Sequence, residues 1–535
     1  MQGLMQQYPL TLVHLFERAE KLFADKSIAT AGRDGVARTS YGEWAERTRR
    51  LGGVLDDLGI SADGRVGTFA WNTARHLELY FAAPCSGRVL HTLNIRLFPE
   101  QLQFVADHAG DEVIFADRSL LRLLWPLIDD LPSVKHVVVM DDGDGDVPDD
   151  ERIRDYEELL AAASPAEFRV EDENSAAAMC YTSGTTGNPK GVVYSHRSTV
   201  LHSMGTLFAD TLAVSESDTI LPVVPMFHAN AWGLAQAGIM AGSSFALPGP
   251  DLSPKAIADL MEGERVTLAA GVPTIWMGML GELEGRDFSS LRMILCGGSA
   301  VPRSLSEAYR EKIGIPMLQG WGMTETSPLA SVSRIRSTLA DRDEDAKADI
   351  RATQGVVSPL VEIRIVDPDT DEVQPWDGRS RGELQCAGPW IAAGYFGGEG
   401  ASQFTDDGWL RTGDVAVIDP DGYIRLVDRT KDLVKSGGEW ISSVELENEI
   451  MAHPKVREAA VIGIQDEKWG ERPLACVVPE EGEELSADDV RDFLDGRVAK
   501  WWVPESIEFI DEVPKTSVGK FSKKTLRERF SEVAT

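Results

Sequence analysis

The chain has 535 residues, a length that corresponds to about three or four domain-sized units. Apolar residues make up 43% and charged residues 26%, a globular balance that excludes a mainly disordered chain, a fibre and a small disulfide-stapled scaffold. The 86 acidic residues exceed the 53 Lys and Arg by 33, which argues against nucleic acid or an anionic membrane as the main partner, because both carry phosphates.

Cysteine use and the N-terminal segment predict the compartment. The five cysteines lie far apart and form no Cys-x-x-Cys pair, which indicates neither a zinc site nor a disulfide framework and fits a reducing environment. The first ten residues lack a basic region followed by an apolar core, so no secretory signal is expected. No apolar run approaches the roughly 18 residues that a membrane-spanning helix needs. We therefore expect a cytoplasmic protein without an integral membrane segment.

The chain up to about residue 355 predicts helices that alternate with short strands. Apolar residues recur at helical spacing over 12–19 and 51–55, with a strand between these helices. Apolar runs and helical stretches then alternate, which is typical of a parallel sheet with crossover helices. The predicted strands are 66–70, 113–115, 137–140, 176–180, 219–224, 244–247, 266–269 and 293–296.

After about residue 355 the pattern changes to strands joined by Asp, Pro and Gly turns, which predicts a smaller β-rich unit. From Lys431 onward, helices and strands alternate again, as in a small α+β domain. The expected fold class is therefore α/β, with a large N-terminal domain of stacked α/β subdomains plus a β-rich subdomain, followed by a small α+β domain. The predicted strands are 361–366, 382–386, 415–418, 423–427, 459–464, 474–478 and 506–510, and the predicted helices are 443–451 and 487–498.

A glycine-rich loop from Tyr181 to Gly191 gives the strongest chemical signal. It follows the predicted strand 176–180 and contains four Ser or Thr hydroxyls, three glycines and one lysine. Glycines let backbone N–H groups approach an anion closely, and the lysine adds a point charge, so the loop predicts a phosphate site. It is not a Walker A loop, which needs Gly directly before Lys, whereas Pro189 precedes Lys190 here. A flexible surface loop is the plain alternative, and this string is far more specific than such a loop requires.

The loop strongly resembles the phosphate-binding signature of the adenylate-forming enzymes, which include acyl-CoA synthetases, peptide-synthetase adenylation domains and firefly luciferase. Further motifs of this superfamily follow in order to the C-terminus, so the resemblance covers nearly the whole chain. It implies a large adenylation domain over residues 1–428 with the ATP and acyl sites, a hinge over 429–432, and a small mobile domain over 433–535. It also implies ATP, CoA and Mg²⁺ as ligands and a small-molecule carboxylic acid as substrate.

Motifs of the large domain acquire roles through this resemblance. His228 would contact the carboxylate side of the acyl pocket, and Trp232 resembles the aromatic gate of fatty acyl-CoA synthetases, with a core tryptophan as the alternative. Glu325 is the expected metal ligand, since Mg²⁺ prefers a few carboxylates together with phosphate oxygens and water. Trp321 stands where the superfamily most often has Tyr, which keeps a stacking face for adenine but loses a hydroxyl. The implied ATP-binding residues are Thr182, Ser183, Gly184, Thr185, Thr186, Lys190, Gly298, Ser299, Gly320, Trp321, Gly322, Thr324, Asp414 and Arg429.

The later motifs imply the remaining roles. Asp414 would accept hydrogen bonds from both ribose hydroxyls, and Arg429 would contact ribose or phosphate. Lys431 matches the hinge residue that absorbs the backbone rotation. Lys520 matches the lysine that reaches the carboxylate and the α-phosphate in the first half-reaction, although a lysine on such a loop is more often plain surface. The loop that the small domain brings in for thioester formation comprises Lys435, Gly437, Gly438, Glu439 and Trp440, with Lys435 in a catalytic role.

The implied chemistry has two steps. A carboxylate attacks the α-phosphorus of ATP and expels pyrophosphate, and the thiol of CoA then attacks the acyl-adenylate and releases AMP. Both steps build charge on oxygens without a covalent enzyme intermediate, so the protein needs positioning and cations more than a nucleophile. A rotation about Lys431 would withdraw Lys520 and bring in the 435–440 loop.

The identity of the acid stays open at this point. The gate motif, the string 438–443 and the segment 93–98 most resemble medium- to long-chain fatty acyl-CoA synthetases, so a fatty acid is the first choice. Methylmercaptopropionate or another short-chain acid is the alternative, because acyl length is set by residues outside the shared motifs. A free-standing adenylation enzyme that loads a carrier protein is the alternative from another class. Relatives are often homodimers, and we expect a homodimer here by analogy alone.

Overall fold

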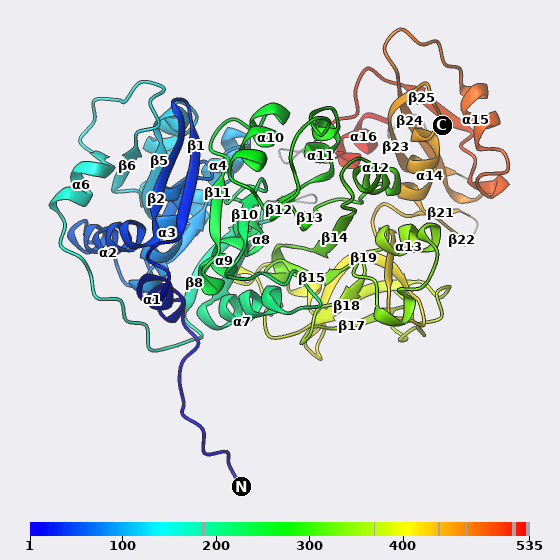
Figure 1. The fold of residues 1–535 in the computed structure, drawn as a ribbon. Coiled ribbons are helices and arrows are strands. Elements are labelled where there is room, and N and C mark those ends of the chain that lie inside the picture. The colour runs from blue at the N-terminus through cyan, green and yellow to red at the C-terminus, as the bar shows by residue number, and fades with distance from the viewer. Residues whose placement is uncertain (183–187, 369, 437–438, 467, 516–520, 531–535) are drawn as a thin grey trace. The chain divides into compact units, whose positions relative to one another are not determined.

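A computed structural model of the chain describes residues 1–182, 188–368, 370–436, 439–466, 468–515 and 521–530 (Figure 1). These residues form two compact units, one made of residues 1–182, 189–362 and 387–408 and the other chiefly of 363–386 and 409 onward. The length alone predicts three or four units. The structure has two, because one buried core joins both sheets of the first unit. Seven predicted site residues lie outside the described residues: Ser183, Gly184, Thr185, Thr186, Gly437, Gly438 and Lys520.

The first unit contains a nine-stranded sheet that is parallel at its centre. Its order is β16-β15-β14-β13-β12-β10-β11-β1-β2, and β2, β15 and β16 run antiparallel to their neighbours. The strands are β1 Ser27–Gly32, β2 Gly35–Ser40, β10 Thr219–Pro222, β11 Ser244–Leu247, β12 Leu268–Gly271, β13 Met293–Cys296, β14 Met317–Gly322, β15 Leu329–Val332 and β16 Val356–Val357.

A seven-stranded sheet completes the strands of this unit. Its order is β7-β6-β5-β3-β4-β8-β9, and it is parallel except for the β8–β9 hairpin. The strands are β3 Arg65–Phe69, β4 Val89–Thr92, β5 Asp111–Asp117, β6 His136–Met140, β7 Ile153–Asp155, β8 Ala176–Tyr181 and β9 Gly191–Ser195.

Helices cover these sheets on both faces. Neighbouring residues of β13 point to opposite sides: Ile294 packs in a core with α10, α11 and α12, whereas Leu295 belongs to the core that contains α1, α3, α7 and α9. Figure 1 shows α10 and α11 on one side of β10–β13 and α7 and α9 on the other. The helices are α1 Leu12–Leu22, α2 Tyr41–Asp57, α3 Ala74–Cys85, α4 Pro99–Ala109, α5 Leu121–Leu124, α6 Tyr156–Ala162, α7 His196–Leu207, α8 Ala229–Trp232, α9 Leu234–Ala241, α10 Pro254–Gly263, α11 Pro273–Met279, α12 Arg303–Ile313 and α13 Glu344–Arg351.

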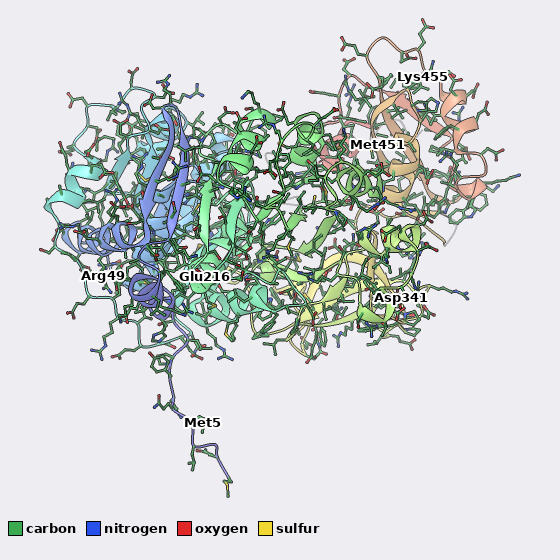
Figure 2. The ribbon with its side chains drawn as sticks, in the orientation of Figure 1. Met5, Arg49, Glu216, Asp341, Met451 and Lys455 are labelled. Atoms are coloured by element: carbon green, nitrogen blue, oxygen red, sulfur yellow. The ribbon has the colours of Figure 1, made fainter. Side chains whose placement is uncertain are left out.

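The pairing of α1 and α2 illustrates how the sequence forms these elements. The apolar face predicted for the first helix is buried, with Phe16 fully enclosed next to Trp44 of α2. Arg49, labelled in Figure 2, binds Glu20 through two hydrogen bonds of 2.6 and 2.7 Å and thereby joins α2 to α1. Ser40 caps α2, because its hydroxyl accepts a hydrogen bond from the backbone N–H of Glu43.

The second unit contains two smaller sheets. A four-stranded sheet has the order β17-β18-β19-β20, and a five-stranded sheet pairs the long hairpin β23–β24 with β21, β22 and β25. The strands are β17 Glu362–Val366, β18 Gly382–Ala387, β19 Leu410–Ile418, β20 Ile424–Arg429, β21 Val434–Ser436, β22 Glu439–Ile441, β23 Val456–Asp466, β24 Gly470–Pro479 and β25 Ser506–Phe509. The helices are α14 Ser443–Met451, α15 Ala487–Leu494 and α16 Lys523–Phe530.

The predicted α/β fold class is confirmed, with stacked sheets in the larger part and a smaller α+β part at the C-terminal end. One helix is shorter than expected: α15 ends at Leu494 and not at Val498, because Asp495 is extended and Gly496 takes a φ of +76°. The hinge over 429–432 stays a prediction. In the described part of the chain, no helix has both the length and the apolar character that crossing a bilayer requires.

Three buried histidines in the first unit predict how its stability depends on pH. Burial lowers the pKa of His76 and of His196 to about 4 and that of His202 to about 3. Two of them accept backbone hydrogen bonds, since Nδ1 of His196 bonds the N–H of Leu12 and Nε2 of His202 bonds the N–H of Leu329. Each histidine is therefore neutral in the folded protein at neutral pH.

The folded pKa of each histidine lies below the ordinary value of about 6.5, so the unfolded chain takes up the proton first. We expect the contribution of these histidines to the free energy of unfolding to be complete above about pH 6.5. It should be lost progressively as the pH falls toward 4. Each histidine contributes a slope of about 1.4 kcal/mol per pH unit within that window. Denaturant unfolding of the wild type and of His202→Gln between pH 7 and 5 measures this slope. The pH slope of the unfolding free energy should be smaller in His202→Gln by the contribution of one histidine. A slope equal to that of the wild type would contradict the role of His202.

Candidate active site

The ends of the predicted phosphate loop are held together by the β8–β9 hairpin. Tyr181 is paired with Gly191, the N–H of Thr182 donates to the carbonyl of Lys190 at 2.9 Å, and the N–H of Lys190 donates to Oγ1 of Thr182 at 3.2 Å. A side chain at Gly191 would lie 3.1 Å from the Tyr181 ring and 3.2 Å from Phe396. Close packing at the base of the loop thus favours glycine at this position.

Lys190 points toward a segment more than 200 residues away. Its Nζ donates to Oε1 of Gln403 at 2.7 Å and lies 5.0 Å from the centre of the Tyr395 ring. The hydroxyl of Tyr395 donates to Oε1 of Glu325 at 2.6 Å. The structure therefore brings the predicted phosphate lysine and the predicted metal ligand to the same tyrosine, to which none of the sequence motifs pointed.

Glu325 follows β14 and is 5% exposed. Its backbone carbonyl accepts from the N–H of Ala392 at 2.8 Å, and the carbonyl of Thr324 accepts from the hydroxyl of Tyr194 at 2.7 Å. A Cβ at Gly322 would collide with the carbonyl oxygen of Pro328, so this turn needs glycine. The predicted residues Gly320, Trp321 and Gly322 lie in β14 itself, and Trp321 is buried.

The residues at Glu325 fit Mg²⁺ bound together with a nucleotide. The described residues hold no cluster of three or more His, Cys, Asp or Glu side chains that could bind a metal ion by themselves. Mg²⁺ is usually held by one or two carboxylates plus substrate phosphates and water. Glu325 offers such a carboxylate, and Thr324, which carries a hydroxyl, precedes it in the chain. The donors are all oxygen atoms, as this ion prefers.

The predicted acyl-side residues stand at a left-handed turn. Ala229, Asn230, Ala231 and Trp232 have φ angles of 42°, 53°, 51° and 58°. Such a conformation costs L-residues roughly 1–2 kcal/mol each, and strain of this kind concentrates at functional sites. His228 directly precedes the turn and is half-buried.

The turn directs Trp232 toward the glycine loop that follows β13. A Cβ built at Gly297 would lie 3.5 Å from the indole of Trp232, and one at Gly298 would lie 3.6 Å from it. Gly298 and Ser299 are exposed. The residue predicted as the acyl gate and the loop predicted to flank adenine are therefore neighbours.

Two buried polar side chains outside the predicted site residues, Asn72 and Cys180, stabilise this region by hydrogen bonds. Oδ1 of Asn72 accepts from the N–H of Met226 at 2.7 Å, and its Nδ2 donates to the carbonyls of Pro222 and Val224. Sγ of Cys180 donates to Oδ1 of Asn230 at 2.6 Å. Asn72 follows β3, and a polar residue after a parallel strand is the one signal in the sequence that pointed to it.

In the second unit, the predicted ribose and hinge residues meet. Asp414 on β19 is paired with Arg429 on β20, and Oδ1 of Asp414 lies 2.7 Å from Nε of Arg429. The backbone N–H of Asp414 donates to Oγ1 of Thr412 at 3.1 Å. Asp414 is 3% exposed, so the structure fixes the position of its carboxylate firmly.

The predicted hinge and Asp428, the residue before it, contact two helices of the same unit. Asp428 accepts hydrogen bonds from the N–H and the hydroxyl of Ser443 at the start of α14. Arg527 of α16 binds Asp432 and the carbonyl of Lys431. α16 begins three residues after Lys520, so the segment that carries the predicted catalytic lysine leads directly into a helix bound to the hinge.

The predicted thioester loop is described in part. Lys435 and Trp440 are paired across β21 and β22, and Nζ of Lys435 lies 4.8 Å from the centre of a Trp440 ring. The backbone of Glu439 belongs to β22. The exposed cation of Lys435 thus stacks on the half-buried indole of Trp440 on this hairpin.

Comparison with known proteins identifies the protein family to which the chain belongs. The family model of the AMP-binding enzymes matches residues 16–396, and that of the AMP-binding enzyme C-terminal domain matches residues 445–520. The chain belongs to the AMP-binding enzyme family. It is 46% identical to a long-chain-fatty-acid–CoA ligase of Thermus thermophilus, with 98% of this chain and 96% of the relative covered.

A second relative and a solved structure support the same class of enzyme. The chain is 44% identical to a 3-methylmercaptopropionyl-CoA ligase of Ruegeria lacuscaerulensis, with both chains covered fully. The solved structure of ATP-bound MatB from Rhodopseudomonas palustris has a TM-score of 0.84 at 28% identity and covers 99% of this chain and 100% of its own. The predicted resemblance is confirmed: the chain is an AMP-forming ligase of the acyl-CoA synthetase class, whose members depend on ATP and CoA.

Proposed function

We propose that the protein converts a medium- or long-chain fatty acid to its acyl-adenylate, with release of pyrophosphate, and then transfers the acyl group to CoA. The observation that carries this proposal is the strained turn that directs Trp232 toward Gly297 and Gly298, because an aromatic gate beside the adenine loop suits an acyl chain that enters next to bound ATP. Relatives named as long-chain and medium-chain ligases, at 46% and 40% identity, support the same acid class.

In the first half-reaction, Lys190 and the donors of the 182–190 loop would bind the phosphates and neutralise their charge. Asp414 would accept from the ribose hydroxyls, and Arg429 would stand beside it. Mg²⁺ held by Glu325 would supply charge neutralisation on the phosphate oxygens. Lys520 would place its cation between the carboxylate and the α-phosphate, where negative charge develops.

In the second half-reaction, the small domain would rotate about Lys431 and exchange Lys520 for the loop from Lys435 to Trp440. The charge and ring of the Lys435–Trp440 pair suit the approach of CoA, which carries phosphates and a pantetheine arm. His228 would lie at the carboxylate end of the acyl pocket. A homodimer stays an expectation by analogy with relatives.

A panel of carboxylates tests the acid class. Each buried methylene contributes about 0.8 kcal/mol, so kcat/KM should rise about fourfold per added CH₂ from butyrate until the pocket is full. Pyrophosphate release and thioester formation, measured with and without CoA, give these values. A peak on medium- or long-chain acids supports the proposal.

Methylmercaptopropionate is the alternative substrate, because the Ruegeria relative is named for it. If kcat/KM peaks sharply on this acid and falls for octanoate, the fatty-acid proposal is wrong and the sulfur acid replaces it. If CoA does not accelerate turnover, a protein-bound acceptor replaces CoA.

A further inference from the structure

Tyr395 contacts two predicted site residues of opposite charge. Its hydroxyl donates to the Glu325 carboxylate at 2.6 Å, and its ring faces Nζ of Lys190 at 5.0 Å. We propose that Tyr395 is a positioning residue that keeps Lys190 and Glu325 apart and directs one toward the phosphates and the other toward the metal ion. This inference rests on the proposed roles of Lys190 and Glu325.

Tyr395 is held firmly enough to position its neighbours. It is 7% exposed, and its ring packs edge-on against Phe404 with the centres 5.5 Å apart. The backbone of the same segment binds Glu325 a second time, through the N–H of Ala392. The hydroxyl therefore meets Glu325 from a fixed position, which orients the carboxylate.

The electrostatic reason for such a spacer is direct. A lysine and a carboxylate in a partly buried site attract each other strongly, and an ion pair between them would cancel the charges that the nucleotide and the metal ion need. In the described residues, no ion pair joins Lys190 to Glu325. The ring of Tyr395 gives the cation an attractive face, and the hydroxyl gives the anion a charge-assisted hydrogen bond, so neither charge is cancelled.

Gln403 completes the arrangement on the lysine side. Its Oε1 accepts from Lys190 at 2.7 Å, and an amide is neutral, so it orients the ammonium group without removing its charge. Gln403 and Tyr395 lie only eight residues apart, so one short segment orients both the ammonium group of Lys190 and the carboxylate of Glu325. The two functions are nevertheless separable by substitution, since the Tyr395 hydroxyl hydrogen-bonds Glu325 and the Gln403 amide hydrogen-bonds Lys190.

Three variants and a matched control test this assignment. Tyr395→Phe removes only the hydroxyl, Tyr395→Leu removes the hydroxyl and the ring face, and Gln403→Ala removes only the amide. Tyr309→Phe is the control, because Tyr309 is also buried and its hydroxyl donates to the carbonyl of Trp276 at 2.8 Å, away from these residues.

Binding is measured without turnover. Electron paramagnetic resonance follows Mn²⁺ binding in the presence of a non-hydrolysable ATP analogue, and calorimetry follows binding of the analogue without metal. Loss of a partner that orients a metal ligand typically costs 10- to 100-fold in metal affinity. For Tyr395→Phe we expect this loss of Mn²⁺ affinity, while the affinity for the analogue changes less than about threefold. For Gln403→Ala we expect weaker binding of the analogue and nearly unchanged Mn²⁺ affinity. Tyr395→Leu should lose both affinities.

Wild-type Mn²⁺ affinity in Tyr395→Phe would overturn the proposal, and so would an equal loss in Tyr309→Phe. If Tyr395→Leu fails to fold, Tyr395→Phe and Gln403→Ala still decide between the two patterns. A failure of the proposed function is distinguishable, because in that case the wild type itself would bind no Mn²⁺ with the analogue or would form no acyl-adenylate from any acid.

Discussion

Replacing Lys520 with alanine is expected to abolish acyl-adenylate formation and to leave thioester formation from a supplied acyl-adenylate nearly intact. In the first step the lysine would stabilise charge that develops between the carboxylate and the α-phosphate, and loss of one such group typically costs about 10²- to 10³-fold in rate. In the second step the rotated small domain would have withdrawn it. Pyrophosphate release measures the first step, and acyl-CoA formed from synthetic acyl-adenylate measures the second.

Lys515→Ala is the matched control for this experiment. Lys515 lies in the same motif, five residues earlier, and its Nζ binds Glu458 at 2.6 Å. We expect both half-reactions of this variant to stay close to wild type, because the cation serves a surface ion pair. A similar loss in both half-reactions of Lys520→Ala would contradict the division of labour between the two steps.

The second large effect is on stability. Lys523→Met should lower the free energy of unfolding by about 3–5 kcal/mol, because it leaves a buried carboxylate without its cation. Nζ of Lys523 lies 2.7 Å from Oε1 of Glu447, and their side chains are 10% and 8% exposed. Burial raises the pKa of Glu447 and of Asp428, and Lys523 opposes this rise in both.

The sign of the pH effect follows from those shifts. Without Lys523, the folded pKa of each carboxyl rises further above its unfolded value, so the folded state retains a proton that the unfolded state releases. The loss of stability should therefore grow as the pH rises above about 5 and shrink as the pH falls toward 4. Denaturant unfolding at pH 5 and pH 8 measures both values.

Glu447→Gln and the double variant Glu447→Gln/Lys523→Met complete a mutant cycle. Glutamine can still accept the 2.7 Å hydrogen bond from the N–H of Val461, so this change removes the charge and keeps a backbone contact. The double variant should be more stable than Lys523→Met alone, since no unpaired carboxylate remains at this position. Strict additivity of the two single changes would show that the pair is not coupled.

Local patterns predicted much of the fold. The strand predicted over 293–296 and the helix predicted over 443–451 match β13 and α14, because an uninterrupted apolar run and a serine cap determine them locally. The prediction of a helix over 487–498 was wrong at its C-terminal end, because the helix ends at Leu494 and Gly496 adopts a positive φ. Neither pattern nor composition indicated the left-handed turn from Ala229 to Trp232, since it contains no glycine.

The site was predictable only as far as its motifs reach. Lys190 and Glu325 lie in recognisable strings, but Gln403 meets Lys190 across 213 residues and Tyr395 meets Glu325 across 70. Such contacts arise from packing between distant segments, and no local spacing encodes them. Asn72 is a further example, because its contacts with Pro222, Val224 and Met226 exist only in the folded chain.

Isotope transfer tests the central claim most directly. If a fatty carboxylate attacks the α-phosphorus of ATP, octanoate labelled with ¹⁸O at both carboxyl oxygens must give AMP with one ¹⁸O and octanoyl-CoA with the other. Mass spectrometry of both products after complete conversion measures this distribution. One label in AMP for each thioester formed is the predicted result, and AMP without label beside labelled phosphate or pyrophosphate would contradict the account.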